Sequence, residues 1–295
     1  MTQIEFFDGS KRKYNIMLPS CWDEMTADQV RFVFREYDKV VSGKLSPLQL
    51  EVLLVFRLLG LRRISTKSAF NEAVTSNIAQ ICKTIDYIFL SSENGALPQL
   101  SFCSVQNPLP AVRTKARVLT GPATLCQDLT FGEYRQASVA LNAFFQSSDI
   151  RDLDECIAHL YRPQSAVANK AGRKVRPVLP ETFESEVKAV SGIPGWQKNI
   201  IMMWFASCIN YLQTGTLTLG GEEVDMSRLF SSSDGSGQPS TWNDLLIQLA
   251  REGTIGNIEA VDEAPLMVVL LHMWSNYKEN KRHEKAAKAR KTRKA

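Results

Sequence analysis

Cysteine and histidine side chains have the greatest capacity for covalent chemistry in this sequence, and one such pair is closely spaced. Cys156 and His159 are three residues apart, which in a helix would place a thiol about one turn from an imidazole base. Reactive pairs of this kind usually assemble from distant segments, so we interpret both side chains as structural. His272 follows Leu271 in a second helical pattern, and it fits a helix-surface or partly buried residue better than a general base.

The six cysteines are scattered along the chain and do not form a metal-binding pattern. No two of them have C-x-x-C spacing, and zinc sites usually contain close ligand pairs of that type. The acidic groups at 152–155 and 222–225 lack the fixed spacing of a calcium-binding loop. We interpret both groups as solvated charge, the first in the opening turns of a helix, where the helix dipole favours carboxylates. The sequence therefore predicts reduced thiols, no metal and no cofactor.

Motifs for phosphate binding and nucleophilic catalysis are also missing from the sequence. Neither GxxxxGKS/T nor a strand-associated GxGxxG occurs, and the glycine cluster at 234–237 precedes no helix start with a phosphate-binding lysine. No GxSxG nucleophile elbow is present. We therefore expect a protein that is not an enzyme. The competing hypothesis, an enzyme of unknown type, requires a deep polar pocket that gathers Cys156, His159, His272 or scattered acidic residues.

Charge is distributed unevenly, because a basic tail ends a mildly acidic body. The whole chain has 35 basic and 31 acidic residues, of which residues 278–295 hold nine and two. The rest of the chain has 26 basic and 29 acidic residues, so the body carries a net charge of −3 and the tail a net charge of +7. The tail is interpreted either as a solubilising, flexible terminus or as a contact for phosphates or an acidic partner. The candidate contact residues are Lys281, Arg282, Lys285, Lys288, Arg290, Lys291, Arg293 and Lys294.

No aromatic residue follows Tyr277, so stacking on single-stranded bases is not expected of the tail, and any nucleic-acid affinity would be weak and non-specific. A membrane contact is not expected either, because the basic stretch has no apolar face. The most apolar run, 199–212, is shorter than the ~20 residues that span a bilayer, which favours a buried core helix. The N-terminus lacks the apolar core of a signal peptide, and we expect an intracellular protein.

Periodicity and capping signals predict a mainly α fold that opens with a β-hairpin over residues 3–18, turning at Asp8-Gly9. Thr26 with Gln29 and Thr130 with Glu133 have capping-box spacing, and Ser46-Pro47 has the pattern of an N-cap followed by proline. Further helices are expected at about 77–90, 150–161, 195–213, 242–252 and 265–277, the helices before and after residue 148 forming an antiparallel pair. Asp262 and Glu263 are interpreted as acidic residues before the last helix.

Proline and glycine positions predict the connections between the helical modules. Residues 91–125 are expected to connect the modules, with short strands in LSFCSV and ARVLTG. Residues 164–180 are expected to form a loop, and residues 214–240 an exposed loop or a hairpin. The predicted organisation is residues 1–118 as an N-terminal hairpin and helical module, 119–277 as a C-terminal helical module, and 278–295 as a basic flexible tail.

Several blocks resemble uncharacterised proteins that are encoded in the structural-gene clusters of phages and prophages of gut-type bacteria. The blocks are LPSCWDEMTADQVRF (18–32), SPLQLEVLLVFRLLGL (46–61), residues 121–163 with LTFGEY and LYRP, and residues 241–273. Such proteins look like tail morphogenesis factors, and their motifs carry no chemistry. The resemblance implies a chaperone-like or adaptor protein that binds other tail or structural proteins in the host cytoplasm.

An assembly factor of this kind needs amphipathic surfaces that accept partner helices. The apolar stripes of the last two predicted helices are the candidates, with Trp242, Leu245, Leu246, Leu249, Leu266, Leu270, Met273 and Trp274 as partner-binding residues. The alternative is a nucleic-acid-associated protein that uses the basic tail, together with Lys170 to Arg176. The sequence does not identify the partner or the oligomeric state.

Overall fold

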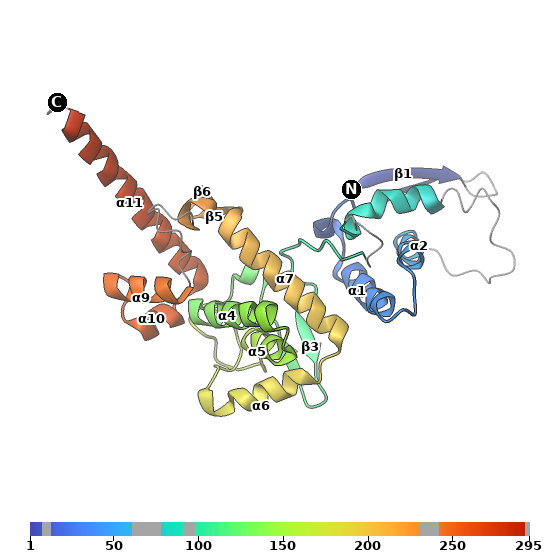
Figure 1. Ribbon diagram of the computed structural model, residues 1–295, viewed down its shortest axis with the longest axis horizontal. Helices are drawn as coiled ribbons and strands as arrows, with labels where there is room; N and C mark the ends of the chain where they lie inside the picture. Colours follow the sequence, from blue (N-terminus) through green and yellow to red (C-terminus); the bar gives the residue numbers. More distant parts are fainter. Residues whose placement is uncertain (8–12, 61–77, 91–97, 231–241, 293–295) are drawn as a thin grey trace. The chain divides into compact units, whose positions relative to one another are not determined.

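The computed structural model describes residues 1–7, 13–60, 78–90, 98–230 and 242–292 (Figure 1). The fold is mainly α, as the sequence predicts, and the strands among these residues form three separate two-stranded antiparallel sheets. The chain divides into two compact units. Unit 1 comprises Met1–Leu109 and Ile193–Ser207, and unit 2 comprises Pro110–Gly192 and Cys208–Ala295.

Unit 1 opens with the predicted hairpin, in which Ile4 pairs with Ile16. The proposed turn at Asp8-Gly9 lies outside the described residues. Two α-helices and two 3-10 helices follow. Residues 78–82 are also helical and continue directly into the second 3-10 helix, which begins at residue 83. The elements are β1 (Thr2–Phe7), β2 (Lys13–Leu18), η1 (Trp22–Glu24), α1 (Ala27–Val41), α2 (Pro47–Leu58) and η2 (Lys83–Ile88).

Aromatic side chains form the centre of unit 1. The ring of Phe102 lies 5.0 Å from that of Trp22 and 5.5 Å from that of Phe34, in edge-on arrangements. Trp204 is fully buried, and its indole Nε1 donates a hydrogen bond of 2.9 Å to the carbonyl oxygen of Val105. Ile193–Ser207 therefore supplies core side chains to a unit whose other residues all precede position 110.

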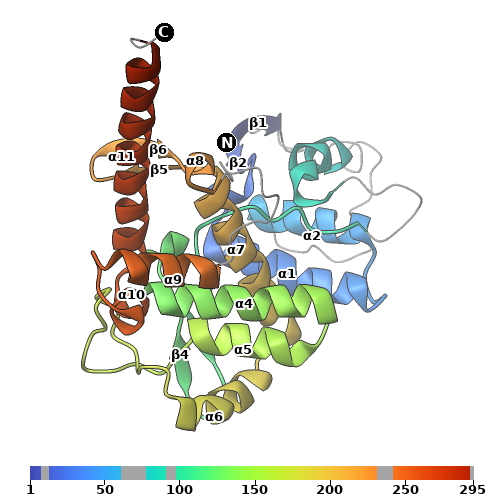
Figure 2. The same ribbon diagram turned by 60° about the vertical axis from the view of Figure 1, so that its left-hand side comes forward.

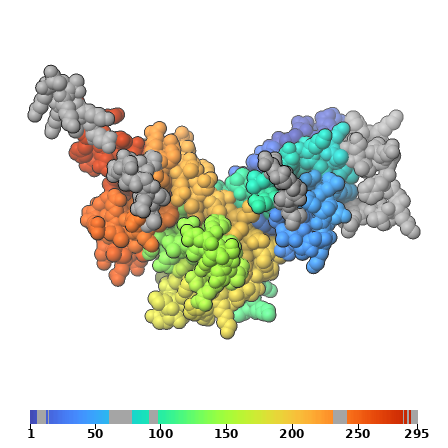
Figure 3. Space-filling view, in the orientation of Figure 1, coloured from blue at the N-terminus to red at the C-terminus, as the bar shows by residue number. Residues whose placement is uncertain are grey.

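Unit 2 is built around α4 (Phe131–Ser147) and α5 (Ile150–Leu160), which lie side by side as the predicted pair (Figure 2). Ser148 adopts a left-handed conformation with φ of 58° and ends α4. α6 (Pro180–Ser191) packs against α5, and the surface of α4 to α6 is the green-to-yellow region of Figure 3. The other elements are β3 (Ala111–Arg113), β4 (Val118–Thr120), η3 (Thr124–Cys126), β5 (Thr216–Leu219), β6 (Glu222–Asp225), α8 (Ser227–Phe230), α9 (Trp242–Glu252), α10 (Ile258–Glu263) and α11 (Leu266–Thr292).

The boundary between the units differs from the predicted division at residue 118. It falls between Leu109 and Pro110, and the helix predicted as a buried core helix, α7 (Gly195–Thr214), contributes residues to both units. The sequence pattern shows which residues of a helix are apolar, but it does not show which other elements pack against them. It therefore could not assign Ile193–Ser207 to unit 1.

Several elements differ from the predictions. ARVLTG contains strand β4, whereas LSFCSV forms no strand beyond a single bridge between Leu100 and Phe89. Helices α6 and α10 were not predicted, because α6 buries only Val187 and Val190 and α10 has six residues. Asp262 and Glu263 precede the last helix, as predicted, but they lie at the end of α10 and not in the first turn of α11.

The last helix continues well beyond its apolar stripe, although fraying was expected from Lys278 onward. α11 runs from Leu266 to Thr292. Lys278 donates a hydrogen bond of 2.8 Å to Glu222, and its Nζ lies 5.5 Å from the ring of Trp274. These contacts fix the turn where apolar packing ends, and the following Ala, Lys and Arg residues have high helix propensity.

Candidate binding site

A cavity of about 800 Å³ opens in unit 2 where the start of α4, the end of α5 and the loop after α5 meet α6 and α10. Its polar lining includes Glu133, His159, Arg162, Asn169 and Asp262. The pocket thus brings the predicted histidine together with acidic residues, but neither Cys156 nor His272 lines it.

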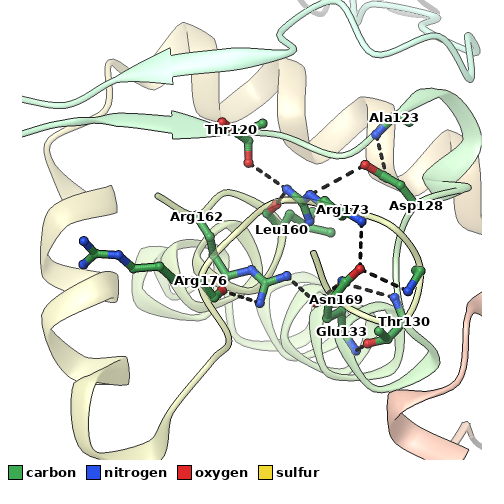
Figure 4. A network of polar contacts seen from close by, with 11 residues as sticks. Thr120, Ala123, Asp128, Thr130, Glu133, Leu160, Arg162, Asn169, Arg173 and Arg176 are labelled. Atoms are coloured by element: carbon green, nitrogen blue, oxygen red, sulfur yellow. Dashed lines mark hydrogen bonds and ion pairs between the residues drawn. The ribbon is translucent and has the colours of Figure 1, made fainter. Parts of the chain in front are cut away.

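Glu133 connects the cap of α4 to the loop beside the cavity. Thr130 and Glu133 form the predicted capping box, in which the Thr130 amide donates to Glu133 Oε2 at 3.1 Å. The other oxygen, Oε1, accepts hydrogen bonds from Arg162 Nη2 and from Asn169 Nδ2, the latter at 3.1 Å (Figure 4). One carboxylate therefore caps a helix and also holds two residues that are distant in sequence.

Arg162 and Arg173 are the buried cations of this network, with exposed fractions of 3% and 4%. Arg162 Nη1 donates to the carbonyl oxygen of Arg176 at 2.9 Å, in addition to its bond with Glu133. Arg173 Nη2 donates to the carbonyl oxygen of Thr120 at 2.7 Å and to that of Leu160, and its Nε lies 3.7 Å from Asp128. Burial lowers the pKa of Arg173, with Arg162 contributing in the same direction.

The two guanidinium groups therefore fix the loop that covers the cavity. Asn169 completes this arrangement, because its Oδ1 accepts hydrogen bonds from the amides of Ala171 and Arg173 at 3.1 and 2.9 Å. Buried charges are tolerated when they are paired and hydrogen-bonded, and here both arginines bind backbone carbonyls as well as carboxylates. The loop is predicted correctly as irregular, but its side chains hold a defined geometry.

His159 lies in the wall of the cavity and is 8% exposed. Its ring stacks on that of Phe183, with centroids 4.5 Å apart. Burial lowers the pKa of His159 to about 4, and the positive charges of Arg162 and Arg135 contribute. The imidazole is therefore neutral near pH 7, and its Nδ1 has no hydrogen-bond partner among the described residues.

The environment of Cys156 and His159 opposes a reactive thiolate. Cys156 is fully buried, and burial raises the pKa of its thiol. A thiolate–imidazolium pair requires shifts in the opposite direction for both groups. All six cysteines are free, and Cys82, Cys126 and Cys208 are buried like Cys156.

Asp262 closes the opposite side of the cavity through a two-point ion pair. Arg135 Nε and Nη2 donate to its two carboxylate oxygens at 3.1 and 2.7 Å, and Arg135 Nη1 donates to Asn243 at 2.6 Å. Gly132 permits this approach, because a Cβ atom there would lie 3.0 Å from Asp262. At the rim, Lys170 forms an ion pair of 2.5 Å with Glu263.

The predicted partner-binding residues belong to the packing of unit 2. Leu246, Leu249, Leu266, Leu270 and Trp274 are buried, while Leu245 and Met273 are half-buried. The half-buried Trp242 ring lies edge-on to that of Tyr134, with centroids 4.9 Å apart. The accessible apolar side chains on the same helices are Ile247, Val268 and Leu271. A partner role of the predicted residues stays a prediction.

The predicted phosphate-contact residues fall into two groups. On α11, Arg282 and Lys285 are exposed, and Lys281 Nζ lies 5.7 Å from the ring of Tyr277. The side chains of Lys288, Arg290 and Lys291, and all of Arg293 and Lys294, lie outside the described part of the structure. In the 170–176 segment, Arg173 is buried, whereas Lys170, which forms an ion pair with Glu263, is exposed, as are Lys174 and Arg176.

Sequence reasoning identified Glu133 only as a capping residue and did not identify Arg162 or Asn169. The one local signal was the position of Arg162, between the last turn of a helix and Pro163, where a long cationic side chain can reach back along the helix. Nothing local indicates that residues 29 and 36 positions after Glu133 contact it.

Within the described residues, no group of three or more histidine, cysteine or acidic side chains is arranged to hold a metal ion. A search of the same residues finds no helix with the length and apolar character required to cross a membrane. No protein-family model matches the chain, and no match was found among curated proteins or solved structures.

Proposed function

We propose that this protein is a non-enzymatic adaptor of phage or prophage tail assembly, which binds an acidic surface of another tail protein with the basic half of α11. The observation that carries the proposal is that the basic end of α11 is helical and projects from unit 2. It is a helical arm that extends beyond the other elements of unit 2 (Figures 1 and 2).

The base of the arm is anchored by apolar and polar contacts. Leu266, Val269 and Leu270 are buried in unit 2, and Glu222 accepts hydrogen bonds from Trp274 Nε1 at 3.0 Å and from Lys278 Nζ at 2.8 Å. A docking element that is already helical loses less conformational entropy on binding than a disordered one. This anchoring therefore favours a binding arm over a merely solubilising tail.

The charge of the arm determines the kind of surface that it fits. Arg282 and Lys285 are one turn apart and exposed, and the segment from 278 onward has a net charge of +7. Such a helix accelerates encounters with an acidic surface and makes binding sensitive to salt. The phage-tail setting comes from the resemblance of the sequence blocks, which supports structural tail proteins as the partners.

Co-expression with the tail tube and tape-measure proteins, followed by affinity capture, tests the proposal. The double variant Arg282→Glu with Lys285→Glu should reduce capture at least tenfold, because it reverses two charges without shortening the helix. Lys188→Glu on the exposed face of α6 is the matched control and should leave capture unchanged. Capture of no tail protein by the wild-type chain would refute the tail-assembly function.

A second candidate, non-specific nucleic-acid binding, is favoured by the exposure of Arg282 and Lys285. Contacts with phosphates release counterions, so the affinity for duplex DNA should fall steeply as salt rises. Truncation after Tyr277 should abolish the shift of DNA or RNA in a gel. An identical shift with the truncated chain would exclude this function of the arm.

A further inference from the structure

We propose that the free edge of strand β1 is a self-association surface, on which β1 of a second copy of this chain pairs in the antiparallel direction. The two hairpins would then form one four-stranded sheet around a two-fold axis. This inference goes beyond the adaptor function and does not rest on it, because β1 belongs to unit 1 and α11 to unit 2.

One edge of β1 has no strand beside it in the part of the chain that the structure describes. β1 pairs with β2 in a sheet of two strands and runs along the outside of unit 1 (Figure 1). The backbone from Thr2 to Glu5 forms no hydrogen bond outside this hairpin with any described residue. A free edge presents a row of N–H and C=O groups, and the ligand that satisfies such a row is another extended strand.

The hairpin is also small for a sheet that stands alone. A two-stranded hairpin is marginally stable in water, and three or more strands with an apolar face are usually needed. Here Ile4 lies opposite Ile16 on one face, and both are half-buried, while Gln3 and Glu5 on the other face are exposed. Pairing of two hairpins would give four strands with the isoleucines of both copies on one face.

The features that usually protect a sheet edge are present in β2 and missing from β1. β2 begins with Lys13, and Pro19 follows its last residue directly. Lysine and proline at an edge oppose pairing with another chain, whereas β1, with the sequence TQIEFF, contains neither. The combined sheet would therefore close as a dimer, because its outer strands are the two protected β2 strands.

The order of residues in β1 favours a second copy over an unrelated strand. In antiparallel pairing about an axis through Ile4, this isoleucine lies opposite Ile4 of the second copy, and Gln3 lies opposite Glu5 on both sides of the axis. Glu5 is the only charged residue in β1, so this register places no like charges opposite each other. Each glutamine amide is a donor and each carboxylate an acceptor, so the two cross-strand pairs are complementary.

Sedimentation velocity of the full chain over roughly a hundredfold range of concentration tests the proposal. We expect a reversible monomer–dimer equilibrium. Gln3→Glu places two pairs of like charges across the interface and should weaken dimerisation roughly tenfold. Gln3→Lys places opposite charges there and should dimerise at least as tightly as the wild type. Gln99→Glu, the same substitution at an exposed residue of unit 1 outside the hairpin, is the matched control and should not change dimerisation.

Amide hydrogen exchange of residues 2–5 gives a second readout, since these amides should exchange more slowly as the concentration rises. A chain that stays monomeric at every concentration, or equal dimerisation of Gln3→Glu and Gln99→Glu, would overturn the proposal. Loss of tail-protein capture in Gln3→Glu, with a wild type that stays monomeric, would assign the edge to another protein and overturn it as well. Truncation after Tyr277 should leave dimerisation intact, which separates this test from that of the arm.

Discussion

Replacement of Glu133 by glutamine should destabilise unit 2 strongly, because three donors converge on this carboxylate. Its oxygens accept from the Thr130 amide, from Arg162 Nη2 and from Asn169 Nδ2. Glutamine keeps the size of the side chain, but it removes the charge that compensates the buried Arg162 and turns an NH₂ group toward one of the donors. Leaving one partner of a buried ion pair uncompensated costs about 3–5 kcal/mol.

The matched control is Glu155→Gln. Glu155 pairs with Arg151 across one turn of α5 at 3.2 Å, and Arg151 is 57% exposed. Solvent-exposed pairs of this type contribute roughly 0.2–1 kcal/mol, so this variant should be close to the wild type. The two substitutions are chemically identical and differ in the burial of the cation that loses its partner.

Thermal unfolding followed by far-UV circular dichroism measures the difference. For a unit of this size, each kcal/mol lowers Tm by about 2–4 °C, so Glu133→Gln should lower the transition of unit 2 by roughly 6 °C or more. Glu155→Gln should lower it by no more than about 4 °C. Equal shifts in the two variants would refute the argument that Glu133 compensates a buried charge.

Three further predictions concern packing, pH and the arm. Gly132→Ala should lower the free energy of unfolding in urea by about 1–3 kcal/mol, because the new Cβ would crowd Asp262 of α10. Gly195→Ala is the control, since a Cβ at that position would have no atom within 4 Å, and it should leave the stability unchanged. Equal stability of the two variants would contradict the close approach of Gly132 to α10. The folded pKa of His159 is about 4 and its ordinary value is 6.5, so the unfolded chain binds more protons between these values. Stability should thus fall by up to about 3 kcal/mol as pH drops from 6.5 to 4, and His159→Gln should lose this component; identical pH profiles would argue against it. Glu222→Gln removes the anion that holds Lys278, so amide hydrogen exchange after residue 278 should accelerate, and unchanged exchange would show that the pair does not anchor the arm.

Local signals allowed much of the fold to be predicted from the sequence. The capping boxes at Thr26 and Thr130 and the N-cap at Ser46 were correct, because each depends on residues within one helical turn. The fraying of the last helix from Lys278 was predicted from its missing apolar face. Contacts with Glu222, on a strand 56 residues earlier, extend the order at its base and could not be read from that pattern.

The candidate pocket was far less predictable than the helices around it. Its polar wall depends on Glu133 meeting Arg162 and Asn169, and its other side depends on Asp262 meeting Arg135 across 127 residues. Such pairings follow from the packing of α4 against α5 and α10, and neither residue type nor spacing encodes them. His159 shows the same limitation, because its burial depends on Phe183 in a helix that was not predicted.

The most direct test of the adaptor function is the affinity of the purified chain for its captured tail protein at low and at physiological salt. Arg282→Glu with Lys285→Glu should weaken binding at least tenfold, and raising the salt should weaken binding of the wild type more than that of the double variant. Equal affinity of the wild type, the double variant and Lys188→Glu at both salt concentrations would contradict the assignment of α11 as the binding arm.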